Sequence, residues 1–335
     1  MIIPCPVDFW NYLKYPLTWA ILITNLLMYM IFFVDGKESV SWVGFLSQDN
    51  ITMTGRVYAA YIKDLPEVER EKLPAWTKNL KIQNNEHYQT LGSWALRDYT
   101  FLKQAEKFEV VGDVVALSHW RAGMVSFKES YFDQLVFRLG LSQANQSSLS
   151  WITYQFSHSS FLHLVSNMVY FLIIGAAVEA MIGSVGLILL YILGGIFAGY
   201  FFLMIKSHGG AVPVVGASGS ISALISFYVV FEARTRIRYA YFVSLMPKHH
   251  GYIYLPTLWM FPLFIVSDFA HYLSSVDGLG SGVAYTAHMG GSLFGVAAAL
   301  ILRFGFSMKN NLLRSEIFGI IPLRPAQSPD AKYSP

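Results

Sequence analysis

Apolar runs long enough to cross a lipid bilayer constrain this chain more than any other feature of its sequence. A transmembrane helix needs about 17 to 25 mostly apolar residues, because backbone polar groups inside the bilayer must bond within the helix. Segments of this kind lie at residues 15–34, 161–178, 184–205, 215–232, 252–273 and 284–303. Charged residues make up 13% of the 335, against roughly a quarter in soluble domains. The sequence therefore predicts an all-α, polytopic membrane protein with a bundle of six transmembrane helices.

The predicted spans divide the chain into four regions: 1–34, 35–150, 151–303 and 304–335. The first holds the N-terminus and the first span, the third holds the other five spans, and the fourth is a Pro- and Ser-containing tail that we expect to be disordered. The second is a large first loop, in which Asp113 is a candidate N-cap for a helix beginning at Val114. We expect a helical insertion that either covers the mouth of the bundle as a packed lid or lies on the bilayer surface.

Basic residues predict the orientation of the bundle, because loops rich in Lys and Arg stay in the cytoplasm. The fourth loop and the tail carry Arg234, Arg236, Arg238, Lys248, Arg303, Lys309 and Arg314. With six spans, both termini are expected in the cytoplasm and the first, third and fifth loops outside, and we expect a bacterial cytoplasmic membrane. A net charge of +3 with scattered basic residues does not favour nucleic acid as a partner. The single cysteine, Cys5, excludes an internal disulfide.

Polar residues from three separate spans fall at a similar depth in this topology. His163 and Asn167 lie in the first turns of the second span, Ser218 in the first turn of the fourth, and His288 in the first turns of the sixth. All three spans enter the bilayer from the outer side. Polar groups inside a bilayer are costly and usually face a bundle interior or a wet cavity. We therefore expect these side chains to meet a few residues below the outer surface.

Small residues indicate how closely two of these spans approach. Gly291 and Gly295 follow His288 on one face of the sixth span, and Ser222 and Ser226 follow Ser218 on one face of the fourth. Such narrow faces let helix backbones pack closely in a membrane. For the Gly-x-x-x-Gly pattern taken alone, ordinary helix packing is the simpler interpretation. Together with the polar residues, it predicts that Ser218 and His288 come within reach of each other.

A serine hydroxyl becomes a good nucleophile when a base takes its proton. His288 is the candidate base, and no acidic residue lies near it in the chain, so a Ser-His dyad is expected with Ser218. His163 and Asn167 are candidate donors to a developing oxyanion, with the backbone N–H of Ser218 as a third. Taken singly, a membrane serine often bonds to its own helix and a histidine often only packs. His158 is expected to be a supporting hydrogen-bonding residue.

The combination resembles the rhomboid family of intramembrane serine proteases over residues 150–303. The matching segments are His163-x-x-x-Asn167, Gly216-Ala217-Ser218-Gly219, Ala287-His288 and Gly291-x-x-x-Gly295. The resemblance implies a six-helix core, Ser218 as nucleophile, His288 as general base, and His163 and Asn167 in an oxyanion site that opens outward. It also implies substrates that are single-span membrane proteins, and it requires neither a cofactor nor a metal. The oligomeric state is left open.

Two positions depart from the family pattern. Ser222 stands four residues after the nucleophile, where an aromatic residue often stacks on the catalytic histidine. The Trp-Arg pair that many members carry shortly before the first histidine motif is absent there, since Trp120-Arg121 lies too far upstream. What positions His288 is therefore an open question at the level of sequence.

Two other functions are compatible with parts of the pattern. A non-catalytic rhomboid-like protein would bind transmembrane clients, although such relatives usually lack the serine or the histidine. A transporter or metal site would use His158, His163 and His288, but no intramembrane carboxylate lies near them in the sequence. Proteolysis is the function that accounts for the serine, the histidines and the asparagine together.

Overall fold

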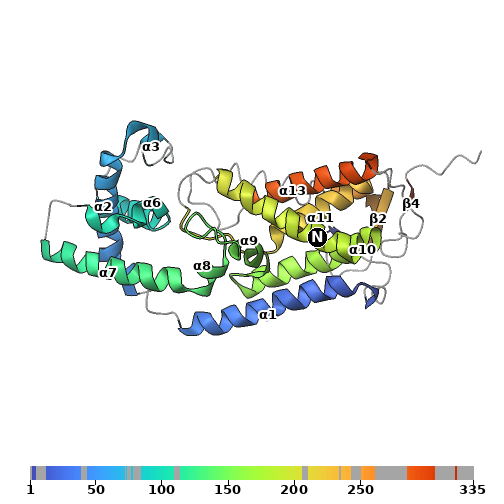
Figure 1. Ribbon diagram of the computed structural model, residues 1–335, viewed down its shortest axis with the longest axis horizontal. Helices are drawn as coiled ribbons and strands as arrows, with labels where there is room; N and C mark the ends of the chain where they lie inside the picture. Colours follow the sequence, from blue (N-terminus) through green and yellow to red (C-terminus); the bar gives the residue numbers. More distant parts are fainter. Residues whose placement is uncertain are drawn as a thin grey trace, which may run out of the picture.

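The computed structural model describes residues 2–4, 13–38, 44–71, 73, 77, 84–108, 114–205, 210–233, 235–242, 250–260, 285–305 and 321–322. The chain is mostly helical. Figure 1 shows a bundle of long helices with a group of shorter helices at one end and a small sheet at the other.

Among the described residues, three helices are long and apolar enough to cross a membrane. They are α1 (Pro16–Glu38), α10 (Phe161–Ile205) and α13 (Tyr285–Leu300), the last continued by a π-helical turn, η7 (Ile301–Gly305). The 45 residues of α10 are too many for one span, and Gly183 interrupts them with φ of 75°. The helix thus consists of two segments, at the positions of the predicted second and third spans.

The helix that begins at Ser218 is shorter than the others. This helix, α11 (Ser218–Phe231), has 14 residues, and nearly all of its side chains are buried inside the bundle. It packs against α13 and α10 (Figure 1). The apolar residues of such a central helix are not confined to one face, because the helix meets protein rather than water in every direction.

An antiparallel sheet corrects the all-α expectation. Its strands are β1 (Ile2–Pro4), β2 (Thr235–Phe242), β3 (His250–Pro256) and β4 (Ile321–Pro322), with β1, β3 and β4 all paired to β2. In β2 the residues alternate between Arg or Ala and larger apolar side chains, and Ile237 and Tyr239 are fully buried. This period of two, with β-branched and aromatic residues, is typical of a strand.

The sheet also corrects the predicted fifth span. Residues 252–256 of that span belong to β3, and the short helix η5 (Thr257–Trp259) follows them. The rest of the predicted span, from residue 261, lies outside the described residues, as does most of the predicted tail. Apolar content alone predicted a helix over this span. Its first residues instead form a strand, because they pair with β2.

Contacts between distant helices define the sheet end of the bundle. The carboxylate of Glu179, near the bend in α10, accepts hydrogen bonds from the backbone N–H groups of Leu17 and Thr18 at 3.1 and 2.8 Å. Arg303, beyond the end of α13, donates to the carbonyls of Val230 and Phe231 at 3.1 and 2.9 Å. The start of α1, the bend of α10 and the ends of α11 and α13 therefore lie together (Figure 1).

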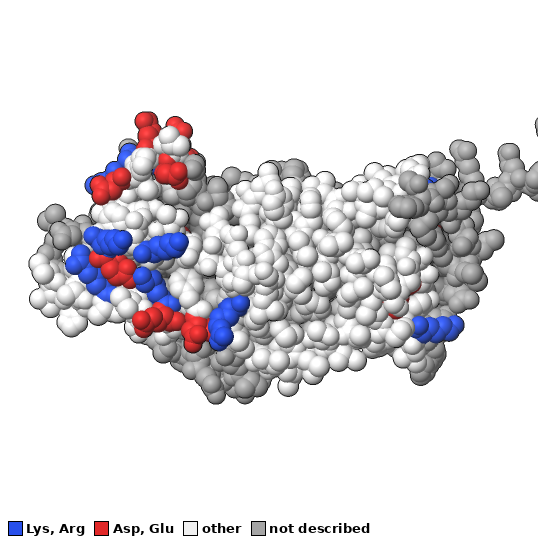
Figure 2. Space-filling model, in the orientation of Figure 1, with Lys and Arg blue, Asp and Glu red and all other residues white. Residues whose placement is uncertain are grey.

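The first-loop region, residues 44–133, has a core of its own at the opposite end of the molecule (Figure 1). Its helices are α2 (Gln48–Asp64), α3 (Glu67–Glu71), α5 (Asn85–Ala95), α6 (Tyr99–Leu102), η3 (Ala105–Lys107) and α7 (Val114–Asp133). The core is rich in aromatic residues, including Tyr58, Trp94, Phe101, Trp120 and Phe127. Figure 2 shows charged side chains gathered over this region, while the visible face of the bundle is almost free of them.

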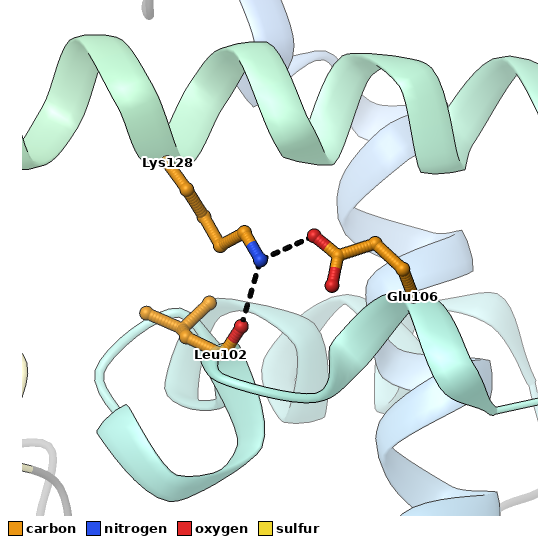
Figure 3. A network of polar contacts seen from close by, with 3 residues as sticks. All are labelled: Leu102, Glu106 and Lys128. Carbon is orange, nitrogen blue, oxygen red and sulfur yellow. Dashed lines mark hydrogen bonds and ion pairs between the residues drawn. The ribbon is translucent and has the colours of Figure 1, made fainter.

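Polar contacts inside the first-loop region fix its helices relative to one another. The indole N–H of Trp120 on α7 donates to Thr54 Oγ1 on α2 at 3.0 Å. Lys128 on α7 forms an ion pair with Glu106 and donates to the carbonyl of Leu102 at 3.1 Å (Figure 3). These contacts join α7 to α2 and to the segment that follows α6. The short helices α8 (Leu135–Leu139), α9 (Ser150–Thr153) and η4 (Tyr154–Phe156) lead from this region to α10.

Candidate active site

Ser218 is the first residue of α11 and is half-buried. The loop before it requires a glycine, because Gly216 has φ of 130° and a Cβ there would lie 2.9 Å from the His163 ring. The N–H of Gly216 donates to the carbonyl of Tyr154 at 2.9 Å. The loop is therefore anchored two residues before Ser218, and its backbone passes directly against a histidine.

His163 and Ser218 converge on this glycine. From the position that a Cβ of Gly216 would take, His163 Nε2 is 3.0 Å away and Ser218 Oγ is 3.7 Å away. The other ring nitrogen, Nδ1, makes a 3.3 Å hydrogen bond with Ser159 Oγ. The Ser160 hydroxyl accepts from the backbone N–H of His163 at 3.2 Å and caps α10. Ser159 thus holds the ring at Nδ1, and Ser160 caps the helix that carries it.

Glycines bring α13 against the beginning of α11. A Cβ on Gly291 would lie 2.0 Å from the carbonyl oxygen of Gly219, and one on Gly295 would lie 2.1 Å from that of Ala223. The Ala287 carbonyl lies 3.7 Å from the corresponding position of Gly219. The helix that carries His288 therefore touches the residue after Ser218, and only glycine permits backbones this close.

His288 lies in the first turn of α13 and is 9% exposed. Tyr285, one turn earlier on the same helix, meets the ring of His288 edge-on, with centroids 6.3 Å apart. Ser222 instead donates its hydroxyl to the carbonyl of Ser218 at 2.8 Å, along its own helix. An aromatic neighbour of His288 thus comes from α13, at a spacing that sequence analysis did not consider.

Asn167 lies one turn after His163 on α10 and is 7% exposed. Its side-chain amide donates one hydrogen bond to the carbonyl of His163 at 3.0 Å. A primary amide has a second N–H, so this bond orients the side chain and leaves a donor. Three groups can donate hydrogen bonds to an anion here. Asn167 and His163 belong to α10, and the backbone N–H of Ser218 belongs to α11.

His158 precedes α10 and lies outside the membrane-spanning helices. Its side chain is 1% exposed and meets His163 edge-on, with ring centroids 5.1 Å apart. Burial, together with the nearby His163, lowers the pKa of His158 to about 3. The ring is therefore neutral at physiological pH, and it packs against the ring of His163. Neither ring nitrogen makes a hydrogen bond within the described part of the chain, so the expected hydrogen-bonding role of His158 stays a prediction.

Tyr154 and Gln155, which sequence analysis did not select, contact both α10 and α11 next to Ser218. The Tyr154 hydroxyl donates to the carbonyl of Gly195 on α10. Gln155 is fully buried and accepts from Ser220 Oγ at 3.0 Å, which ties it to α11. A Cβ on Gly195 would lie 2.2 Å from Gln155 Oε1. Residues in a short helical turn carry no periodic pattern, so only the tertiary contacts reveal their role.

The loop before Ser218 is also joined to the first-loop region. The N–H of Ala211 donates to the carbonyl of Arg97 at 3.2 Å, and Ala211 is fully buried in the core of that region. Further along, Val214 and Leu141 exchange two backbone hydrogen bonds of 2.8 and 3.1 Å. The segment from residue 210 to Ser218 thus runs from the first-loop region to the start of α11.

The described residues contain no group of three His, Cys, Asp or Glu side chains placed to share a metal ion, and His158, His163 and His288 are among those described. What the arrangement offers is a hydroxyl, imidazole nitrogens and amide donors close together at the ends of three apolar helices. These groups are suited to proton transfer and to stabilising an anion near Ser218.

Comparison with known proteins identifies one family. Residues 145–304 match the family model of the rhomboid domain. No match was found among curated proteins. The matched range includes Tyr154, His158, His163, Asn167, Gly216, Ser218, Gly219, His288, Gly291 and Gly295. The chain therefore carries a rhomboid domain between residues 145 and 304.

Proposed function

We propose that this protein is an intramembrane serine endopeptidase that cleaves membrane-protein substrates in or near their transmembrane segments. The observation that carries the proposal is the convergence of Ser218 Oγ and His163 Nε2 on Gly216, beside the helix that bears His288. Rhomboid family proteins are typically proteases of this kind, and the serine and both histidines are present. Apolar helices long enough to cross a membrane support a site inside the bilayer.

The proposed reaction assigns a step to each group. His288 takes the proton of Ser218 Oγ as the oxygen attacks the carbonyl carbon of the scissile peptide bond. The resulting oxyanion accepts hydrogen bonds from His163 Nε2, the free N–H of Asn167 and the backbone N–H of Ser218. His288 then gives its proton to the leaving amine, and the C–N bond breaks to leave an acyl-enzyme.

Hydrolysis of the acyl-enzyme repeats these roles. His288 takes a proton from a water molecule, whose oxygen attacks the ester carbonyl, and then returns a proton to Ser218 Oγ. The orientation of His163 by Ser159, through the 3.3 Å contact at Nδ1, directs the Nε2 hydrogen toward the oxyanion. Removing one such donor typically costs about 100- to 1,000-fold in rate.

The proposed substrate class rests on the resemblance to the rhomboid family, and the proposed orientation rests on the basic residues of the loops. We propose single-span membrane proteins as substrates, in a bacterial cytoplasmic membrane, with both termini in the cytoplasm and the site opening outward. Ser218 and His163 lie at the starts of α11 and α10, at the end of the bundle opposite to the sheet. A substrate helix would therefore be cut near the outer end of its span.

The test uses the full-length protein in liposomes with a single-span test substrate. Wild type is expected to cleave the substrate and to react with a fluorophosphonate probe, whereas Ser218→Ala and His288→Ala abolish both activities. Ser222→Ala is the matched control, because this hydroxyl bonds within its own helix one turn away and is expected to leave cleavage in place. Cleavage by Ser218→Ala at the wild-type rate would disprove the mechanism. Substrate binding without cleavage by wild type would favour a non-catalytic client-binding protein.

A further inference from the structure

The side of the hairpin β2–β3 that faces away from the bundle core carries arginines and tyrosines. Arg236 and Arg238 alternate with the buried residues of β2, and the register places Arg238 opposite Tyr254. The guanidinium of Arg238 lies over the ring of Tyr252, 4.4 Å from its centroid. Tyr252 and Tyr254 are 63% and 40% exposed, and Arg236 is exposed as well. Two positive charges and two phenol rings thus share one accessible surface.

The opposite face of the same hairpin fixes its place in the molecule. Ile237 and Tyr239 are fully buried in the bundle core, and Leu255 packs against the same core. Thr235 follows shortly after Phe231, the last residue of α11, and Arg236 pairs with Ile321 of β4. The sheet therefore covers the end of the apolar bundle (Figure 1). Where transmembrane helices end, the surrounding solvent changes from hydrocarbon to lipid headgroups.

Residues next to the hairpin continue this surface toward the bilayer. Leu258 and Trp259, in the short helix after β3, are 48% and 53% exposed. Trp and Tyr prefer the membrane interface because their rings have an apolar body and a polar edge. Arginine suits the same level, since its planar guanidinium binds phosphate with two parallel hydrogen bonds. The exposed residues therefore suit two adjacent layers of a bilayer. The apolar Leu258 and Trp259 suit the hydrocarbon edge, and the neighbouring arginines and tyrosines suit the headgroup layer.

We propose that this face of the hairpin binds the phosphate of anionic phospholipid headgroups. Arg236 and Arg238 contact the phosphate, and the ring of Tyr252 holds the Arg238 guanidinium in place. Trp259 and Leu258 insert among the upper parts of the acyl chains. The interaction is independent of proteolysis, because none of these residues belongs to the site around Ser218. It anchors the sheet end of the bundle in the plane of the membrane.

The test measures lipid binding to the delipidated full-length protein in detergent by native mass spectrometry. Wild type is expected to retain phosphatidylglycerol in preference to phosphatidylcholine. The double variant Arg236→Gln, Arg238→Gln is expected to bind phosphatidylglycerol roughly 10-fold more weakly, because each basic residue near an anionic surface contributes a few-fold to binding. Arg236→Lys, Arg238→Lys keeps both charges but loses the planar guanidinium that stacks on Tyr252, so we expect binding weaker than in wild type and stronger than in the glutamine variant.

A matched control removes charges of the same kind from the other end of the molecule. Arg56 lies over Tyr88 at 5.5 Å and Lys103 over Tyr99 at 4.8 Å, both in the first-loop region. The double variant Arg56→Gln, Lys103→Gln is expected to bind like wild type. An equal loss in this control, or no lipid preference in wild type, would overturn the proposal. Displacement of the lipid by inorganic phosphate would assign the face to free anions and overturn it too.

Discussion

The first-loop region and the bundle close the ends of their helices in different ways. In the first-loop region the residue just before a helix supplies the cap: Ser47, Asn84 and Asp98 accept from backbone N–H groups at the starts of α2, α5 and α6. In the bundle, Glu179 of α10 closes the start of α1, and Arg303 closes the end of α11. The start of α10 also has a local cap, Ser160, whereas the start of α1 and the end of α11 take their partners from distant segments.

Glycine serves the same purpose in both regions, although their cores differ. The bundle brings α11 and α13 together at Gly291, and the first-loop region brings α2 and α5 together at Gly55, where a Cβ would lie 1.9 Å from the Tyr88 carbonyl oxygen. Around these contacts the first-loop region packs aromatic rings, with Tyr58 and Phe101 edge-on at 4.9 Å. The comparison predicts that equivalent glycine changes disable different parts of the molecule.

The largest effect is expected from Gly291→Ala. The new methyl group would lie 2.0 Å from the Gly219 carbonyl oxygen, which belongs to backbone and cannot rotate away. Such overpacking is expected to cost about 3 kcal/mol or more and to abolish probe labelling of Ser218. Gly55→Ala makes the same clash in the first-loop region and is expected to destabilise that region while the bundle stays folded. Thermal unfolding combined with limited proteolysis distinguishes the two.

Gly44→Ala is the control for both glycine variants, because nothing lies within 4 Å of its Cβ position. A change within about 0.5 kcal/mol is expected there. If Gly55→Ala unfolded the bundle as completely as Gly291→Ala, the two regions would form one cooperative unit, and the contrast between them would be wrong.

Asp98→Ala tests the junction between the regions and is expected to cost about 2 to 4 kcal/mol. The carboxylate is 2% exposed and accepts from the Tyr58 hydroxyl at 2.9 Å and from the Phe101 N–H at 3.1 Å. Burial and the nearby carboxylate raise the pKa of Tyr58, so this hydroxyl stays protonated and needs an acceptor. Asp98 also forms a backbone bridge with Gly210, in the loop before Ser218.

Cleavage kinetics and hydrogen exchange measure the result of Asp98→Ala. We expect slower cleavage together with faster exchange in the loop from residue 210 to Ser218. Tyr58→Phe keeps the carboxylate and its bond to Phe101, so a smaller effect is expected from it. A normal cleavage rate in a destabilised Asp98→Ala protein would show that the first-loop region does not position the loop.

Lowering the pH is expected to reduce the free energy of unfolding through protonation of His158. Its pKa is lowered from 6.5 to about 3 in the folded protein, so unfolding takes up a proton below pH 6.5. The stability contribution is complete above pH 6.5 and falls as the pH drops toward 3, by about 2 kcal/mol at pH 5. Unfolding in detergent as a function of pH measures it, with His158→Gln as the variant that lacks this titration. The same pH slope in His158→Gln would assign the effect to other groups.

The smallest effect is expected from Glu106→Gln, which removes the ion pair with Lys128 in the first-loop region (Figure 3). The two side chains are 23% and 21% exposed, and such pairs contribute less than about 1 kcal/mol. Lys128 keeps its bond to the Leu102 carbonyl, which reduces the loss further. Thermal unfolding is expected to shift slightly and cleavage to stay unchanged. A loss comparable to that in Asp98→Ala would show that the pair holds α7 in place.

Several elements could be read from residue types alone, because the pattern that produces them is local. The apolar runs predicted α1, both halves of α10, α11 and α13, since the free energy of placing a residue in hydrocarbon depends on that residue. The pairing of Gly291 and Gly295 with the backbone of α11 agrees with the small-residue pattern. The strands were missed, because the first residues of β3 read equally well as part of an apolar span.

Residue types and spacing determined which chemistry this chain has at the ends of its spans: a serine after Gly216, a histidine on a glycine-faced helix, and a second histidine one turn from an asparagine. Tertiary structure decided which contacts hold these residues and the helices of the bundle in place. Tyr285 at the edge of His288, Gln155 beneath Ser220 and Glu179 at the start of α1 are contacts that combine distant segments or depend on side-chain direction. No local propensity encodes such pairs, because each exists only once the backbones have packed.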